Sequence, residues 1–305
     1  MRIEAPAKLN LCLFLGPRRE DGLHELCSLF EPLALADLID VSELDPSSRE
    51  SVGSQDEVVC PGVEDENLVT RALAALRRDG WSGPPLRIEI EKRIPVAAGL
   101  GGGSADAAAV LRLARSGVPP DADGRNDGPG NAGRPGPAPD LEEIATVLGA
   151  DVPSQLVPAL SLVQGIGERV ERLPDPAPHA VVLLPAGGGL RTAAVFAEAD
   201  RLGLGRGTNE LERLAKRLRE AAGNGASPLE YAELLANDLE PAARSLRPDV
   251  GAALDALRGA GAAPALVTGS GPTAFGLFAD LAVAERAAAE LDRDDAIVCE
   301  AGRAS

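Results

Sequence analysis

The chain of 305 residues has no long apolar run and few aromatic residues, seven in all. No stretch approaches the ~20 consecutive apolar residues that cross a bilayer, so we expect no membrane span. Residues 1–8 lack the apolar core of a signal peptide, which predicts a cytoplasmic protein. Apolar residues still make up 45% of the chain, so it can bury a sizeable core in one large domain or two ordinary ones.

Positive charge is also scarce, with a formal net charge of −17. This balance argues against a nucleic-acid surface, and it means that an anionic substrate must be met by local positive features. The only lysines are Lys8, Lys92 and Lys216, so each of them stands out.

Metal-binding side chains are sparse and scattered. The cysteines Cys12, Cys27, Cys60 and Cys299 form no C-x-x-C pair, and the chain has only two histidines. A structural zinc site is therefore not expected, and the cysteines are interpreted as small buried hydrophobic residues.

Glycine, in contrast, is concentrated where a strand-like run (86–91) meets an alanine-rich helix (104–115). The join contains Gly99, Gly101, Gly102 and Gly103, followed by Ser104. Unpaired amides and the dipole make a helix N-terminus positive, and glycines let another group approach the backbone. The alternative is a flexible turn with a helix cap at Ser104. The order of strand, glycines and helix favours a phosphate-binding site.

This loop differs from two common phosphate loops. A Walker motif has Lys followed by Ser or Thr, whereas Ser104-Ala105 stands here, and the dinucleotide fingerprint fits only in part. The form Pro-x-x-x-Gly-Leu-Gly-Gly-Gly-Ser-Ala resembles the phosphate loop of the GHMP kinases, which by itself does not choose a substrate.

The rest of the chain mixes strands and helices without a regular β-α-β alternation, which favours an α+β fold. Expected strands cover 9–15, 38–42, 86–91, 161–164, 180–184, 265–268, 274–278 and 296–300. Expected helices cover 66–78, 104–115, 140–148, 209–222, 229–236, 248–258 and 281–291. Residues 119–139 hold Pro, Gly, Asp and Asn with almost nothing apolar, and predict a loop or disordered insertion.

Four further segments sharpen the resemblance to GHMP kinases. They are 5–13 with 19–26 (APAKLNLCL and REDGLHEL), 148–153 (LGADVP), 237–241 (NDLEP) and 266–275 (LVTGSGPTAF). Together they resemble the members that phosphorylate the 2-hydroxyl of a cytidine diphosphate-linked methylerythritol in the non-mevalonate isoprenoid pathway. The resemblance implies two domains, a ribosomal protein S5 domain 2-like one at 1–159 and a ferredoxin-like one at 160–305. The active site would lie in the cleft between them.

The resemblance also implies the catalytic residues. Asp151 would accept the hydroxyl proton as general base, and Lys8 beside it would favour the alkoxide. The alternatives are a helix cap or turn for Asp151 and a solvated surface lysine for Lys8, although Lys8 interrupts an otherwise apolar strand pattern.

ATP would bind along the glycine loop, with Mg²⁺ as cofactor. The residues assigned to ATP are Pro95, Val96, Ala97, Ala98, Gly99, Leu100, Gly101, Gly102, Gly103, Ser104, Ala105 and Asn67. Ser104 is also a candidate contact to Mg²⁺, which takes few protein ligands. Asn67 is either an adenine contact or a helix N-cap. Asp106 is a second-sphere candidate, but we favour a simple interaction with the helix dipole.

For the substrate, the resemblance assigns Asn10, His24, Asp151, Thr192 and Phe196. His24 would hydrogen-bond a cytosine edge and Phe196 would stack on it or belong to the core. Leu23 stands where a tyrosine is usual, which removes one stacking ring. Residues 268–273 form a second glycine-rich turn, either beside the active site or simply joining strands.

These assignments predict an ATP-dependent kinase with a small-molecule substrate, no nucleic-acid or membrane partner, and a monomeric or homodimeric state. Two alternatives stay open: another GHMP kinase acting on homoserine, mevalonate or a sugar, and a nucleotide-binding member without catalysis. Retention of both Lys8 and Asp151 argues against the second, because a binding protein needs no base paired with a cation.

Overall fold

The computed structural model describes residues 1–44, 56–63, 67–116, 139–291 and 293–301. They group into two compact units. The first unit comprises residues 1–5, 36–93 and 102–156, and the second comprises 6–35, 94–101 and 157–305. The units therefore do not follow a single cut in the sequence, because residues 6–35 and 94–101 cluster with the C-terminal half. The expected insertion at 119–139 lies outside the described residues except for its last position.

The elements mix strands and helices throughout, which confirms the α+β prediction. The strands are β1 (Arg2–Arg18), β2 (His24–Glu43), β3 (Glu57–Val59), β4 (Leu86–Glu91), β5 (Ser161–Gly165), β6 (Arg169–Arg172), β7 (His179–Leu184), β8 (Ala265–Val267), β9 (Ala274–Phe278) and β10 (Ile297–Ala301). The helices are α1 (Leu68–Arg78), α2 (Gly102–Ser116), α3 (Leu141–Leu148), α4 (Val152–Gln155), α5 (Thr192–Leu202), α6 (Thr208–Ala222), the 3₁₀ helix η2 (Pro228–Leu234), α7 (Glu240–Leu246), α8 (Pro248–Gly259) and α9 (Leu281–Glu290).

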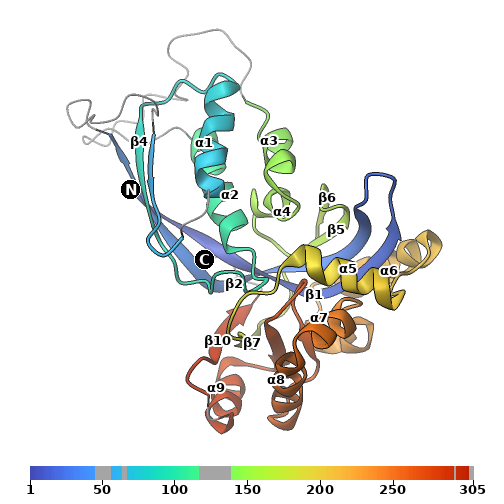
Figure 1. Ribbon diagram of the computed structural model, residues 1–305. Helices are drawn as coiled ribbons and strands as arrows, with labels where there is room; N and C mark the ends of the chain where they lie inside the picture. The colour runs from blue at the N-terminus through green and yellow to red at the C-terminus, as the bar shows by residue number, and fades with distance from the viewer. Residues whose placement is uncertain (45–55, 64–66, 117–138, 292, 302–305) are drawn as a thin grey trace. The chain divides into compact units, whose positions relative to one another are not determined.

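In the first unit, helices pack beside a small sheet. The C-terminal half of β2 pairs antiparallel with β4, from Leu38↔Glu91 to Glu43↔Leu86, and β3 pairs parallel with β4. Helices α1 and α2 run beside these strands (Figure 1). Helix α1 is amphipathic, and its buried face carries Val69, Leu73 and Leu76. A 3.6-residue period that places apolar side chains on one stripe explains this orientation.

Helix α2 is buried on two sides because its core positions are alanines. Ala105 and Ala109 belong to the cluster that contains the strand residues, whereas Ala107 and Ala108 belong to the cluster with α1 and α3. Small side chains let neighbouring elements approach a helix closely, so both clusters pack directly on α2.

In the second unit, neighbouring strands follow the order β2-β10-β7-β9-β8. All of these pairs are antiparallel. Helices α8 and α9 cover these strands (Figure 1). The N-terminal half of β2 also pairs with β5, which continues to β6. Every residue of β7 is buried, so this strand forms part of the core on both faces.

Two predictions about elements were wrong. Strands β1 and β2 extend far beyond 9–15 and 38–42 because their middle residues are buried on both faces, which hides the period of two. The helix expected at 229–236 is a 3₁₀ helix that starts at Pro228 and is interrupted by the non-helical Tyr231. Within the described part of the chain, no helix is long and apolar enough to cross a membrane, and the cytoplasmic location stays a prediction.

Candidate active site

A buried polar cluster surrounds Lys8 on β1. Lys8 and Asn10 stand two residues apart and therefore share one face of the strand, with only 5% and 2% of their surface exposed. Lys8 Nζ donates to Asn10 Oδ1 at 2.5 Å and to the Gly99 carbonyl at 3.2 Å. It also lies 4.8 Å from the centre of the Phe30 ring. Oxygen acceptors and an aromatic face offset the cost of burying the ammonium, so Lys8 is not a solvated surface lysine.

The second glycine-rich turn packs onto this cluster. The Thr268 hydroxyl accepts a hydrogen bond from the Asn10 backbone amide at 3.0 Å. Asn237 stabilises the turn, because its Nδ2 donates to the carbonyls of Val267 at 2.6 Å and Gly269 at 2.8 Å. Gly269 has a positive φ of 57° and lies against Asn10. Two segments 258 residues apart in the sequence thus meet beside Lys8.

The first part of the glycine loop, 95–101, belongs to the same unit and lies against Lys8. The Lys8 backbone amide donates to the Leu100 carbonyl at 2.9 Å. A Cβ added at Gly99 would lie 2.9 Å from the Thr268 carbonyl, and one added at Gly101 would lie 2.8 Å from Lys8 Cγ. Both glycines also have positive φ angles, of 78° and 71°. Sterics and backbone conformation therefore both require glycine at these positions.

We expect Gly101→Ala to lower kcat on the order of a hundredfold, because the new methyl group displaces Lys8 and small misplacements of reacting groups have effects of this size. Steady-state kinetics checks this. Gly203→Ala is the matched control, since Gly203 also has a positive φ, of 69°, but an added Cβ there meets nothing within 4 Å. Equal kcat values for the two variants would contradict the prediction.

The second part of the loop forms the first turn of α2, in the first unit. Ser104 is half-buried and Ala105 is fully buried. The helix begins at Gly102, two residues earlier than predicted, so the amides at its N-terminus come from the glycines themselves. These unpaired donors and the helix dipole suit a phosphate group.

Asp106 does not lie in the first turn of α2, so its assignment as a first-turn dipole partner was wrong. It is 1% exposed and accepts a hydrogen bond from Lys92 Nζ at 2.8 Å, and Lys92 also bonds Asp37. Burial raises the pKa of Asp106 to about 7, with Asp37 adding to the rise and Lys92 opposing it. Burial lowers the pKa of Lys92, but the two carboxylates outweigh burial and raise it. Two acids share one cation, so Lys92 stays charged while Asp106 titrates near neutral pH.

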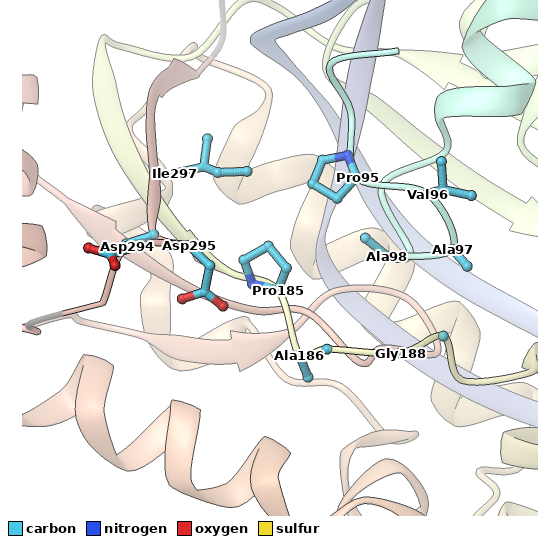
Figure 2. Close-up of a pocket in the computed structure, with 13 residues that line it drawn as sticks. Pro95, Val96, Ala97, Ala98, Pro185, Ala186, Gly188, Asp294, Asp295 and Ile297 are labelled. Carbon is cyan, nitrogen blue, oxygen red and sulfur yellow. The ribbon is translucent and has the colours of Figure 1, made fainter. Parts of the chain in front are cut away.

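The beginning of the loop also lines a cavity of about 520 Å³. Its walls are formed by 95–98, 185–189 and 294–297, and Figure 2 shows Pro95 and Pro185 with the carboxylates of Asp294 and Asp295 on the same cavity. Among the described residues that line it, two are acidic and none is basic, so the lining offers no cation to a triphosphate. We therefore do not place the phosphates on this side of the loop.

The structure also places Asn67 and Asp151. Asn67 is the N-cap of α1, with its side chain accepting from the Val69 amide at 2.8 Å, so the N-cap interpretation is confirmed. Asp151 occupies the N-cap position of α4, but its side chain makes no cap hydrogen bond. A capping role therefore does not account for the Asp151 carboxylate.

The residues expected at the cytidine lie together in the second unit. His24 and Phe196 have ring centroids 5.8 Å apart. His24 Nδ1 lies 3.0 Å from the Gly16 carbonyl, and Nε2 lies 2.9 Å from Asp200 Oδ1 without making a hydrogen bond. Nδ1 therefore has a protein partner, whereas the hydrogen bond expected between His24 and a cytosine edge stays a prediction. Leu23 beside His24 is 49% exposed.

Thr192, at the start of α5, joins the second glycine-rich turn through its hydroxyl, which lies 3.1 Å from the Ser270 hydroxyl. Sequence reasoning missed three contributors to these clusters: Phe30, Ser28 and Asp200. Ser28 and Phe30 are two positions apart on β2. A strand prediction that included this segment would have placed both side chains on the same face. No sequence signal pointed to Asp200.

With this geometry in place, comparison with known proteins identifies the family. Residues 67–124 match the GHMP kinases N terminal domain, and residues 208–296 match the GHMP kinases C terminal model. The chain is 39% identical over 280 residues to a 4-diphosphocytidyl-2-C-methyl-D-erythritol kinase of Mycolicibacterium gilvum, covering 89% of this chain and 80% of the relative. It is 38% identical to the protein of the same name from Mesorhizobium japonicum, over 94% and 90% of the two chains.

Solved structures agree with these sequence matches. A crystal structure of 4-(cytidine 5'-diphospho)-2C-methyl-D-erythritol kinase superposes with a TM-score of 0.74 at 32% identity, over 99% of this chain and 100% of the other. Homoserine kinase from Cytophaga hutchinsonii shares the fold, with a TM-score of 0.61 at 18% identity over 98% and 94%. The chain therefore belongs to the GHMP kinases, in the group formed by the 4-diphosphocytidyl-2-C-methyl-D-erythritol kinases. It is a kinase, as predicted.

Proposed function

We propose that this kinase transfers the γ-phosphoryl group of ATP to the 2-hydroxyl of 4-diphosphocytidyl-2-C-methyl-D-erythritol, giving the 2-phosphate and ADP. The observation that carries the proposal is the high similarity to kinases of this name over nearly the whole chain. The buried Lys8–Asn10 cluster supports it, because a charge is buried at this cost where it is needed for chemistry.

Phosphoryl transfer depends mainly on positioning and on balancing charge. In the proposed mechanism, Asp151 accepts the proton of the substrate hydroxyl as general base. The Lys8 ammonium stabilises the alkoxide that develops on the attacking oxygen, and Asn10 contacts the substrate. The backbone amides of Gly101–Ala105 hold the ATP phosphates and balance their charge.

Magnesium fits the donors that the loop offers. Among the described residues, no group of three or more His, Cys, Asp or Glu side chains could hold a metal. An oxygen donor such as the Ser104 hydroxyl suits Mg²⁺, which keeps several waters and is carried by substrate phosphates. Mg²⁺ bound there would neutralise part of the negative charge of the phosphates. We propose Ser104 as its protein contact. We also propose that Asn67 contacts adenine in addition to capping α1.

The cytosine is proposed to pack against the His24–Phe196 pair. Nδ1 of His24 already faces the Gly16 carbonyl, whereas Nε2 makes no hydrogen bond within the protein, so stacking on the ring accompanies the base-edge hydrogen bond expected from the sequence. The exposed Leu23 provides apolar cover beside them, and Thr192 lies at the nearby second glycine-rich turn.

The test is a coupled ADP-release assay with ATP, Mg²⁺ and 4-diphosphocytidyl-2-C-methyl-D-erythritol, run beside homoserine, mevalonate and galactose. We expect turnover with the cytidine substrate alone. Turnover of another alcohol in its place would overturn the substrate assignment. Binding of ATP without turnover of any alcohol would instead support a non-catalytic member of the family.

A further inference from the structure

Ser28 on β2 has no surface exposed and connects to Lys8 through one intermediate residue. Its hydroxyl donates to the Cys12 backbone carbonyl at 2.5 Å. A hydroxyl has a single proton, and a carbonyl can only accept. The proton of Ser28 is therefore committed to Cys12, and toward any other neighbour Ser28 can act only as an acceptor.

That neighbour is the side-chain amide of Asn10, which has a donor end and an acceptor end. Because Ser28 can only accept, the atom that faces it at 3.0 Å must be the donor Nδ2. Oδ1 is then directed to the opposite side, where Lys8 Nζ donates to it at 2.5 Å. The reversed amide would turn N–H groups toward the Lys8 ammonium and leave Ser28 facing an oxygen.

The hydrogen bonds of the Thr268 hydroxyl are consistent with this orientation of the Asn10 amide. This hydroxyl accepts from the Asn10 backbone amide at 3.0 Å, so its own proton is available to Asn10 Oδ1, 3.5 Å away. Lys8, Asn10, Ser28 and Thr268 are all buried, so these hydrogen bonds are shielded from bulk solvent. The hydrogen bonds therefore run in one direction from Lys8 through Asn10 and Ser28 to Cys12.

We propose that Ser28 is a positioning residue for the phosphoryl transfer. It fixes the orientation of the Asn10 amide, and Asn10 in turn holds the Lys8 ammonium in place. Ser28 itself touches no reacting atom. This inference rests on the proposed function in that it assigns Lys8 to the reacting hydroxyl.

Removing the Ser28 hydroxyl tests the proposal. We expect Ser28→Ala to lower kcat about tenfold to a hundredfold, the range for a buried group that loses its hydrogen-bond partner, while both KM values stay unchanged. Ser28→Thr keeps the hydroxyl and should restore turnover. Ser161→Ala is the matched control, because Ser161 is equally buried and donates to the Ala159 carbonyl at 2.9 Å, in a separate contact. Equal kcat values for the two alanine variants would overturn the proposal.

The route through Lys8 is tested by combining Ser28→Ala with Lys8→Met. If Ser28 acts through Lys8, its substitution has no further effect on kcat once the ammonium is gone. Additive losses in the double variant would mean that Ser28 acts by another route, and the proposal would fall.

A readout that needs no turnover separates this inference from the proposed function. The chain has only three lysines, so labelling lysine with ¹⁵N at Nζ gives few ammonium signals. Ser28→Ala should move the Lys8 signal and leave those of Lys92 and Lys216, whereas Ser161→Ala should move none. Ser28→Cys serves if the alanine variant does not fold. An unmoved Lys8 signal refutes the positioning role, while an inactive wild-type enzyme with a moved signal refutes only the proposed function.

Discussion

Asp151→Asn is expected to lower kcat by about 10²–10⁴-fold, the usual contribution of a general base. Asparagine has almost the same shape as aspartate but cannot take up the hydroxyl proton. The Asp151 side chain makes no cap hydrogen bond to α4, so the substitution removes no cap from this helix. Stopped-time ADP release gives kcat, and equilibrium titration with ATP should show unchanged affinity.

Asp140→Asn is the control for this prediction. Asp140 caps α3 by accepting from the Glu142 and Glu143 amides, and asparagine caps helices about as well as aspartate. This variant should keep both stability and turnover. If Asp151→Asn retains wild-type kcat, the chain is still a kinase, but the required base is a different group.

The sequence predicted the parts of the site that depend on local pattern. The glycine loop was found because strand, glycines and helix follow one another directly, and Gly99 and Gly101 indeed have positive φ angles that glycine accommodates. Lys8 was singled out because a lysine interrupted an apolar run. These signals are short-range, so a single sequence contains them.

The contacts that organise the site are long-range, and no local pattern contains them. The bond between Asn10 and Thr268 joins residues 258 positions apart, and that between Asn10 and Ser28 depends on the pairing of β1 with β2. The N-terminal half of β2 was missed because burial on both faces removed its alternation. Without that strand, nothing in the sequence placed Ser28 beside Asn10.

The cytidine region shows the same limit. His24 was predicted as a hydrogen-bonding residue from its side-chain chemistry and from the resemblance to the family. The structure places the oxygens of Gly16 and Asp200 against both nitrogens, and this follows from packing of α5 against the first strands. The residue type shows which hydrogen bonds a side chain can make. The neighbouring residues determine which of those groups can still bind a ligand.

A buried ion pair in the second unit carries the prediction with the largest expected effect on stability. His179 on β7 and Glu31 on β2 have fully buried side chains, with Nε2 and Oε2 3.2 Å apart. His179 Nδ1 lies 3.0 Å from the Ala177 carbonyl, so both ring nitrogens face oxygen acceptors, an arrangement that favours the doubly protonated, charged ring. Removing Glu31 leaves this cation without its partner.

We therefore expect Glu31→Gln to lower the free energy of unfolding by about 3–5 kcal/mol, the usual result of breaking a buried ion pair. Denaturant titration measures this. The control is Glu171→Gln, which breaks the ion pair between Glu171 and Arg219 at the surface, where both side chains are 44% exposed. Exposed pairs contribute about 0–1 kcal/mol, so a loss of similar size in both variants would show that the buried pair has no special role.

The same pair gives stability a predicted pH dependence. Burial lowers the pKa of His179, but the hydrogen bond and charge of Glu31 outweigh it, so the pKa in the folded protein lies above the usual 6.5. The folded state then binds the proton more tightly than the unfolded state. The stabilisation is fully present below pH 6.5 and is lost as the pH rises through the folded pKa. Asp106, with its raised pKa, acts in the same direction, so the contribution of the pair is isolated by comparing the wild type with the double variant Glu31→Gln/His179→Gln, which leaves neither partner buried alone. The wild type should lose stability more steeply as the pH rises above 6.5, and parallel curves would contradict a charged His179 in the core.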